Sequence, residues 1–68
     1  MKVSKHAMER IKERNITTAE LTTTLRYGKR LVNRTDPSKT TIVLNGKRDV
    51  YMVVDKEETI LITAFVKG

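Results

Sequence analysis

The sequence predicts an α+β domain in which two N-terminal helices pack on one face of a four-stranded antiparallel β-meander. Apolar residues recur at helical spacing in the first part of the chain and then alternate with polar residues, and this period changes only once. The connections between the expected strands are short, which favours an antiparallel sheet. A chain of 68 residues forms one domain, so we expect the order α-α-β-β-β-β over residues 1–68.

The first helix is expected over residues 4–14. Ser4 suits the N-cap position, because its hydroxyl can accept hydrogen bonds from the first helical turn. Asn15 suits the left-handed conformation that follows many helices, and Ile16 can fold back as the hydrophobic contact beyond it.

The second helix is expected over residues 18–27, ending at Gly28. Thr17 and Glu20 have the spacing of a capping box, which favours a helix start. The threonines at 22–24 have poor helix propensity, so packing by the neighbouring leucines would have to stabilise this helix. A strand over these residues is the alternative.

Four strands are expected after the helices, over residues 29–34, 40–45, 48–54 and 59–66. Asp36-Pro37-Ser38 has the composition of a type I turn, and Asn45-Gly46 is a hairpin signal. A two-residue turn there would place Ile42 opposite Asp49, whereas a longer loop would place Ile42 opposite Met52. A one-residue slip exchanges the two faces of a strand. We prefer the longer loop because it keeps charged side chains out of the core.

In either register both faces of the sheet contain apolar residues. One face holds Ile42, Leu44, Val50, Met52, Val54, Ile60, Ile62, Ala64 and Val66. The other face holds Val43, Tyr51, Val53, Leu61 and Phe65, mixed with Thr41 and Thr63. Two helices can cover only one face, and an exposed apolar patch usually marks an interaction site. We therefore expect a protein partner or a second copy of the chain on the second face, unless the sheet coils enough to bury part of it.

The net charge of the chain is +6, and all of the excess lies in the first half. Residues 1–34 hold nine Lys or Arg and three Glu, whereas residues 35–68 hold five basic and five acidic residues. A one-sided basic surface favours an anionic partner, with RNA or DNA first. The alternative is that the charge serves only solubility.

Composition excludes several classes of site. Without cysteine there is no disulfide, and with a single histidine as well the sequence argues against a structural zinc site. No apolar run approaches the roughly 20 residues that cross a bilayer, and the N-terminus is too polar for a secretion signal. We expect a cytoplasmic protein that needs no metal or other cofactor.

A row of cationic side chains, His6, Arg10 and Arg14, recurs at four-residue intervals on the first expected helix. On an ideal helix the row spans about 80° beside the apolar stripe of Ala7 and Ile11. We therefore expect the row to border a cleft between helix and sheet, where nucleotide chemistry is often found. The alternative is structural, because boundary arginines can pair with nearby glutamates and cover apolar surface with their stems.

These side-chain types suit RNA cleavage. The reaction needs a base for the 2′-hydroxyl, positive charge at the pentavalent phosphate and an acid for the departing 5′-oxygen. Histidine can act as base or acid near neutral pH, and the planar guanidinium fits phosphate oxygens. One histidine cannot fill both proton roles at once. The rest would come from a further side chain among Lys29, Arg30, Arg34, Arg48, Tyr51 and Lys67.

The segment SKHAMERIKERNI, followed by TTAEL and by a last strand reading ILITAFVKG, resembles a small bacterial domain grouped with the RelE-like toxins. That superfamily also holds barnase-type and colicin ribonucleases. The resemblance covers nearly the whole chain and implies a metal-independent endoribonuclease of mRNA that an antitoxin neutralises. His6, Arg10 and Arg14 occupy the motif positions and are the candidate catalytic residues. Lys29, Arg30, Arg34 and Arg48 are the candidates for guiding RNA.

Two other functions stay open. One is a non-catalytic dimeric binding or inhibitor module of phage or mobile-element origin, which the spare apolar face favours. The other is a simple nucleic-acid binder. With only Tyr27, Tyr51 and Phe65 as aromatic residues, such binding would depend mainly on phosphate contacts and hence on salt.

Overall fold

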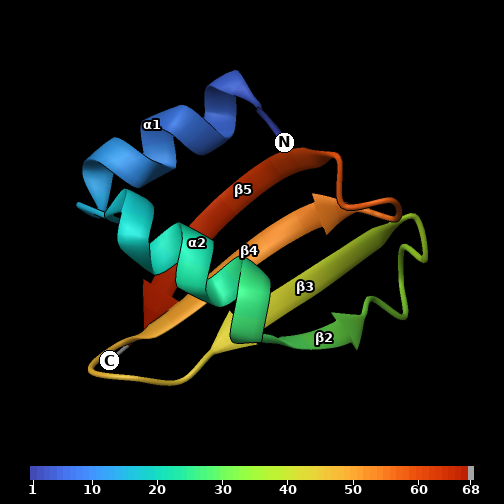
Figure 1. The fold of residues 1–68 in the computed structure, drawn as a ribbon. Coiled ribbons are helices and arrows are strands. Elements are labelled where there is room, and N and C mark those ends of the chain that lie inside the picture. The colour runs from blue at the N-terminus through green and yellow to red at the C-terminus, as the bar shows by residue number, and fades with distance from the viewer. Residues whose placement is uncertain (68) are drawn as a thin grey trace.

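Two helices lie on one face of a five-stranded sheet in the computed structural model, which describes residues 1–67 (Figure 1). The α+β class, the two helices and their order before the meander confirm the prediction. Neither helix of the described residues is long and apolar enough to span a membrane. The elements are β1 (Lys2–Val3), α1 (Lys5–Glu13), α2 (Thr18–Tyr27), β2 (Lys29–Val32), β3 (Lys39–Leu44), β4 (Asp49–Asp55) and β5 (Ile60–Lys67).

The sheet is mixed, with strand order β1-β5-β4-β3-β2, so the prediction of four purely antiparallel strands is wrong. Strands β2 to β5 form the expected antiparallel meander, and β1 adds a parallel strand at the edge of β5. The Lys2 N–H donates to the Thr59 carbonyl at 2.8 Å, and the Ser4 N–H donates to the Leu61 carbonyl at 3.0 Å. A strand of two residues is too short to show a period in the sequence, which is why it was not predicted.

Ser4 begins α1 as predicted and also anchors it. Its Oγ accepts a hydrogen bond from the Ala7 N–H at 3.0 Å and donates to the Ile62 carbonyl in β5 at 2.8 Å. After the helix, Asn15 has the expected left-handed backbone, with φ of 51°. Ile16 follows it and is buried, so the N-terminal helix is fixed to the sheet at both ends.

Residues 18–27 form a helix, so the alternative of a strand there is wrong. The capping box is present: the Glu20 N–H donates to Thr17 Oγ1 at 3.1 Å, and the Thr17 N–H donates to Glu20 Oε1 at 3.0 Å. Thr24 is fully buried, and its Oγ1 is satisfied by a hydrogen bond that it donates to the Glu20 carbonyl at 2.7 Å. At the helix end, a Cβ on Gly28 would lie 2.6 Å from Ile42 Cγ2, so only glycine allows this close approach of α2 to β3.

The strand register follows the longer loop between β3 and β4. Ile42 pairs with Met52 and Leu44 pairs with Val50, which confirms the preferred register. Strand β2 ends at Val32 rather than at residue 34. It ends there because Asn33 Oδ1 accepts hydrogen bonds from following backbone N–H groups and turns the chain.

The core lies between the helices and the sheet. Helix α1 packs on β5, and α2 packs on β3 and β4. Two clusters of buried residues fill this layer, one of Ala7, Ile42, Met52, Val54 and Leu61, and one of Ile16, Val50 and Ala64.

A β-bulge in β5 overturns part of the predicted face assignment. Val53 pairs with Thr63, but Val54 pairs with Leu61, so Ile62 is the extra residue. Leu61 therefore belongs to the core and is 1% exposed, although it was predicted on the second face. Ile60 was predicted in the core and is 39% exposed. The bulge inverts the alternation at this one point of the strand.

The other face of the sheet, here called the open face, carries Thr41, Val43, Tyr51, Val53, Thr63 and Phe65. None of these side chains is fully buried, and no helix of residues 1–67 lies over them (Figure 1). The Tyr51 and Phe65 rings stack with centroids 4.7 Å apart and planes 6° apart. Lys67 Nζ lies 5.6 Å from the Tyr51 ring centroid, so the aromatic pair is bordered by a cation.

Candidate functional site

The cationic row lies on the surface of α1. His6 and Arg14 are exposed, and neither side chain makes a hydrogen bond within residues 1–67. Arg10 is half-buried, and its Nη1 lies 3.2 Å from Glu13 Oε2 in a pair whose side chains are 42% and 58% exposed. Exposed pairs of this kind contribute only about 0.2–1 kcal/mol. The imidazole and the two guanidinium groups can therefore contact an anionic ligand at small cost.

Arg48, predicted to bind nucleic acid, is partly exposed, and its guanidinium is held by contacts within the chain. Its Nε and Nη2 donate to both carboxylate oxygens of Glu20 at 2.9 and 2.8 Å. Its Nη1 donates to the Arg14 carbonyl at 3.0 Å, and Nη2 donates to the Asn15 carbonyl at 2.8 Å. One guanidinium thus ties the connection between α1 and α2 to the start of β4. The Arg48 hydrogen bonds, aided by the Thr17 N–H, lower the pKa of Glu20 to about 2.

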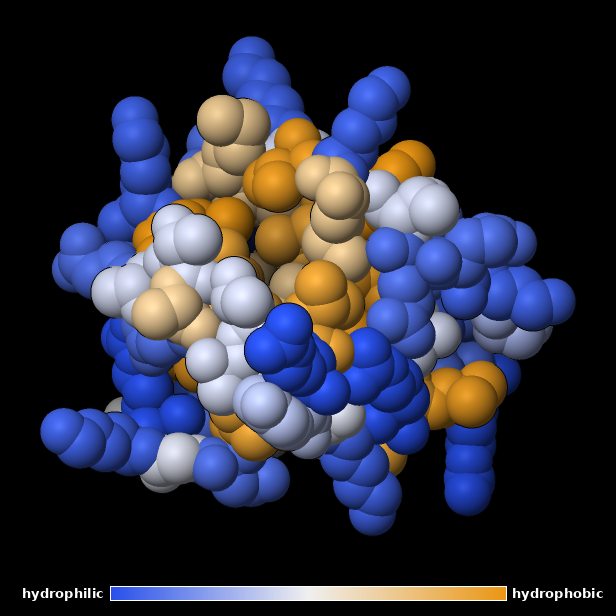
Figure 2. Space-filling view, in the orientation of Figure 1, coloured by the Kyte–Doolittle hydropathy of each residue, from blue (hydrophilic) through white to orange (hydrophobic). Residues whose placement is uncertain are grey.

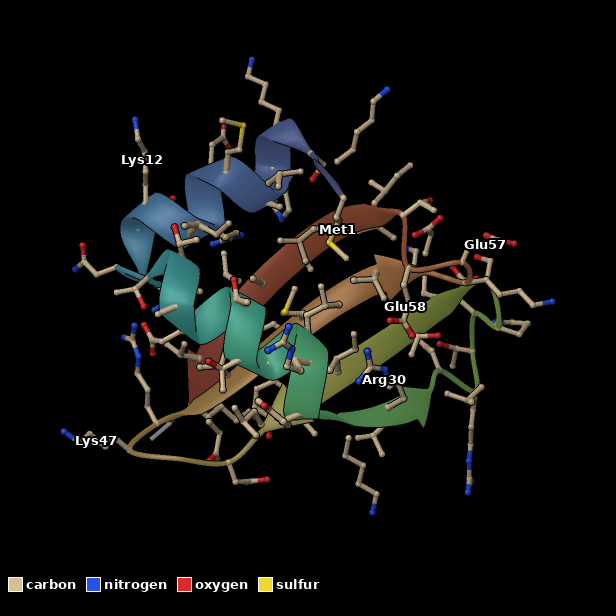
Figure 3. All side chains as sticks on the ribbon, viewed as in Figure 1. Met1, Lys12, Arg30, Lys47, Glu57 and Glu58 are labelled. Atoms are coloured by element: carbon tan, nitrogen blue, oxygen red, sulfur yellow. The ribbon has the colours of Figure 1, made fainter. Side chains whose placement is uncertain are left out.

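Arg30, also predicted to bind nucleic acid, holds the turn between β4 and β5 (Figure 3). Its Nε and Nη2 donate to Glu58 at 3.2 and 2.9 Å, and further donors reach the carbonyls of Leu25 and Gly28 at 2.6 and 3.0 Å. Hydrogen bonding to Arg30 lowers the pKa of Glu58. Lys29 and Arg34, the other two predicted contacts, are exposed on β2 and in the loop after it. Of the four residues, only Arg48 makes a hydrogen bond to a residue of the row within residues 1–67, and it does so through the Arg14 carbonyl.

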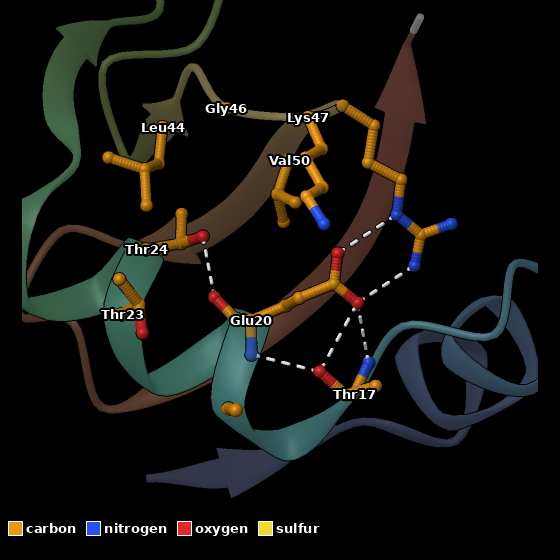
Figure 4. Close-up of a pocket in the computed structure, with 10 residues that line it drawn as sticks. Thr17, Glu20, Thr23, Thr24, Leu44, Gly46, Lys47 and Val50 are labelled. Carbon is orange, nitrogen blue, oxygen red and sulfur yellow. Dashed lines mark hydrogen bonds and ion pairs between the residues drawn. The ribbon is translucent and has the colours of Figure 1, made fainter.

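A pocket of about 430 Å³ lies between α2 and the β3–β4 connection (Figure 4). Its lining combines apolar and polar side chains. The lining residues are Thr17, Ala19, Glu20, Thr23, Thr24, Leu44, Gly46, Lys47, Arg48 and Val50. The sequence did not predict this pocket. Among its lining residues, Arg48 was predicted to contact RNA, whereas Thr17, Glu20 and Gly46 were interpreted as parts of a helix cap and a turn. Only the packing of α2 over the connection creates it.

The end of the row is linked to the pocket by a backbone contact only. The Arg14 carbonyl accepts a hydrogen bond from Arg48, which lines the pocket. His6, Arg10 and Arg14 themselves do not line it. On the same side of the molecule, apolar side chains remain visible between the two helices, with hydrophilic side chains around them (Figure 2). The candidate site is therefore a cationic helix edge that ends beside a pocket.

A metal centre finds no support in the described part of the chain. Within residues 1–67 no group of three or more His, Asp or Glu side chains is placed to hold a metal ion. The chemistry of the candidate site is that of imidazole, guanidinium and backbone carbonyl groups.

Comparison with known proteins gives one match. A family model described as "Domain of unknown function (DUF4258)" matches residues 3–66, and the chain belongs to this family. No curated protein and no solved structure matches the chain.

Proposed function

We propose that this protein is a RelE-like endoribonuclease that cleaves mRNA in the cytoplasm without a metal ion, with His6, Arg10 and Arg14 as its reaction site. The observation that carries the proposal is the contrast between two sets of basic side chains. Arg30 and Arg48 are engaged in bidentate ion pairs and carbonyl contacts. His6 and Arg14 are exposed and have no hydrogen-bond partner within residues 1–67. The row on α1 is thus available to a phosphate.

The reaction would proceed by attack of the 2′-hydroxyl on the adjacent phosphorus. His6 would take the 2′-hydroxyl proton, and Arg14 would bind the oxygens on which negative charge develops. Arg10 would exchange its exposed contact with Glu13 for the same phosphate or the next one. The bond to the 5′-oxygen would break, leaving a 2′,3′-cyclic phosphate and a 5′-hydroxyl whose proton comes from water.

The spacing of the row and the adjacent pocket support an extended substrate. Four helical residues rise about 6 Å, so His6 and Arg10 lie one such interval apart on α1, and Arg14 follows at its C-cap. The pocket beside Arg14 has a volume within the range of small-ligand sites, about 300–1,000 Å³. We expect a base of the bound RNA to enter it.

The test is cleavage of an end-labelled RNA by the purified protein in EDTA. We expect His6→Ala to slow cleavage by about 100- to 10,000-fold, the usual contribution of a proton-transfer group. Lys5→Ala is the matched control, because it removes a neighbouring exposed cation outside the row and should change the rate less than about threefold. If His6→Ala cleaves as fast as the wild type, or inhibits the growth of expressing cells equally, the assignment of this site is wrong.

A second candidate function is a non-catalytic binding or inhibitor module, and the open face of the sheet favours it. Its six residues lie over three adjacent strands and include the stacked Tyr51 and Phe65. This function predicts that the purified wild type leaves RNA intact under all conditions, whereas charged substitutions on the open face abolish association with a protein. The cleavage assay therefore separates the two candidates.

A further inference from the structure

Two arginines outside the cationic row bind the rest of the chain in the same way. Arg48 donates from Nε and Nη2 to the Glu20 carboxylate, and from Nη1 and Nη2 to two backbone carbonyls. Arg30 repeats this pattern with Glu58 and with two other backbone carbonyls. The two arginines differ in what they hold, because one of the carbonyls that Arg48 contacts belongs to Arg14, a residue of the row.

Arg48 completes the C-terminal end of α1. The two backbone N–H groups that follow Arg14 donate to the carbonyls of Lys12 and Ile11 at 3.3 and 3.0 Å. These bonds are those of a Schellman motif and satisfy two of the four carbonyls that a helix end leaves free. Arg48 Nη1 donates to the Arg14 carbonyl at 3.0 Å, and Nη2 donates to the Asn15 carbonyl at 2.8 Å. The end of α1 is therefore held by a side chain 34 residues later in the sequence.

The position of the Arg14 side chain depends on this backbone contact. The side chain is exposed and makes no hydrogen bond or ion pair of its own within residues 1–67. Its backbone N–H donates to the Arg10 carbonyl at 3.0 Å, and its carbonyl accepts from Arg48. His6 and Arg10 lie inside α1 and are fixed by the helix itself, whereas Arg14 is the C-cap. Arg48 therefore restrains the direction in which the Arg14 guanidinium leaves the helix.

Glu20 holds the Arg48 guanidinium in the orientation that this contact needs. The carboxylate accepts from two N–H groups of the guanidinium, and the backbone carbonyls accept from two more. A planar fork can serve all four acceptors at once, whereas a lysine ammonium carries three donors on a single atom. The arrangement therefore requires an arginine at position 48, and a positive charge alone is not sufficient.

We propose that Arg48 is a positioning residue for Arg14 in RNA cleavage, with Glu20 fixing the orientation of Arg48. This role rests on the proposed function, because it belongs to the same reaction. Arg48 acts without touching the reacting phosphate. It keeps the Arg14 guanidinium at the phosphate oxygens on which negative charge develops. A misplacement of about 1 Å at such a group is enough to slow a reaction on the order of 100-fold.

The experiment is a double-mutant cycle between Arg48 and Arg14, measured as the single-turnover rate of RNA cleavage at saturating protein. We expect Arg14→Ala to lower this rate by about 100- to 1,000-fold, the usual cost of removing one donor to the developing charge. Arg48→Lys should lower the rate by about 10- to 100-fold when Arg14 is present. In the Arg14→Ala background the same change should lower it by less than about twofold, because the two residues act through one contact. A change that only destabilises the fold would lower the rate by the same factor in both backgrounds.

Arg30→Lys is the matched control, because it removes a fork of the same kind whose acceptors lie outside the row. Whatever its effect on the rate, we expect that effect to be the same with and without Arg14. Glu20→Gln tests the same role in a variant that keeps the Arg48 fork, so the result does not depend on Arg48→Lys folding. It should lower the rate less than Arg48→Lys does, and it should have no effect once Arg14 is absent. Urea unfolding at the assay pH identifies the variants that are folded.

The outcomes separate this role from the proposed function. If Arg48→Lys and Glu20→Gln leave the rate unchanged, or lower it equally with and without Arg14, the ion pair serves stability only and the positioning role is wrong. An equally large coupling between Arg30 and Arg14 would also overturn it, because the cycle would then report a general loss of stability. A wild type that cleaves no RNA would instead overturn the proposed function, and the positioning role with it.

Discussion

The covered and open faces of the sheet differ in burial although they are built from the same strands. Ile42 and Val43 are neighbours in β3, yet Ile42 is fully buried under α2 while Val43 remains partly exposed. Met52 and Tyr51 show the same contrast in β4. Residue type does not explain the difference, because both faces carry large apolar side chains. Burial depends on which face the helices cover.

The sharpest test of the comparison is at the β-bulge, where two adjacent residues face opposite ways. We expect Leu61→Ala to destabilise the fold by about 2–4 kcal/mol, because it opens a cavity in the core. Ile60→Ala should cost less than about 1 kcal/mol, since Ile60 is 39% exposed. Urea unfolding of both variants gives the two free energies. A larger loss for Ile60→Ala than for Leu61→Ala would mean that β5 lacks the bulge.

Adding a single methyl group between α2 and the covered face of the sheet should also destabilise the fold. Gly28→Ala places a methyl group against the Thr24 carbonyl and 2.6 Å from Ile42 Cγ2, so α2 must move away from β3. We expect a loss of about 1–3 kcal/mol in unfolding free energy, the range seen for overpacked sites. Gly46→Ala in the β3–β4 loop is the control, because its Cβ would meet no atom closer than 3.8 Å. Comparable losses for the two variants would contradict the close approach at Gly28.

The ion pair between Glu20 and Arg48, which both line the pocket, makes the stability of the fold depend on pH. The pKa of Glu20 is lowered from 4.5 to about 2 by Arg48 and Thr17, whereas an unfolded chain keeps the ordinary value. Ionised Glu20 therefore stabilises the fold fully above about pH 4.5, and this contribution is lost as the pH falls toward 2. We expect urea midpoints of the wild type and Glu20→Gln to differ at pH 6 and to converge near pH 2. If the urea midpoints of the two proteins stay the same distance apart at every pH, ionised Glu20 does not stabilise the fold through Arg48.

The smallest effect is expected on the open face. Thr63→Lys should change the unfolding free energy by about 0.5 kcal/mol or less. The reason is that Thr63 lies on the open face, which no helix of residues 1–67 covers. Thermal unfolding followed by circular dichroism is sufficient. A loss as large as that of Leu61→Ala would mean that the open face is part of the monomer core.

The elements built from local signals were predicted well. The caps at Ser4 and Thr17, the left-handed Asn15 and the span of α2 depend on hydrogen bonds within a few residues, so the sequence contains them. The preferred register of β3 and β4 was also correct, because charge exclusion from a core selects one pairing. The pairing of β1 with β5 was not predictable in this way, since it joins segments almost sixty residues apart through two residues.

The candidate site likewise has features that the sequence predicted and features that only the folded chain determines. The sequence placed His6, Arg10 and Arg14 along one side of a helix, and helix geometry alone is enough for that. It could not distinguish these groups from Arg30 and Arg48, which looked equally free as basic residues. Their acceptors, Glu58 and Glu20, are each 28 residues away, so only the folded chain brings these ion pairs together.

By itself the sequence determined the helices, the meander, the surplus of positive charge in the first half and the presence of two apolar sheet faces, because each depends on periodicity or composition. Tertiary structure decided which arginines are held in ion pairs, where the pocket lies and which way Leu61 points. These features depend on contacts between distant segments and on a single extra residue in β5. Neither the contacts nor the extra residue changes the hydrophobic period of the sequence, so sequence analysis does not detect them.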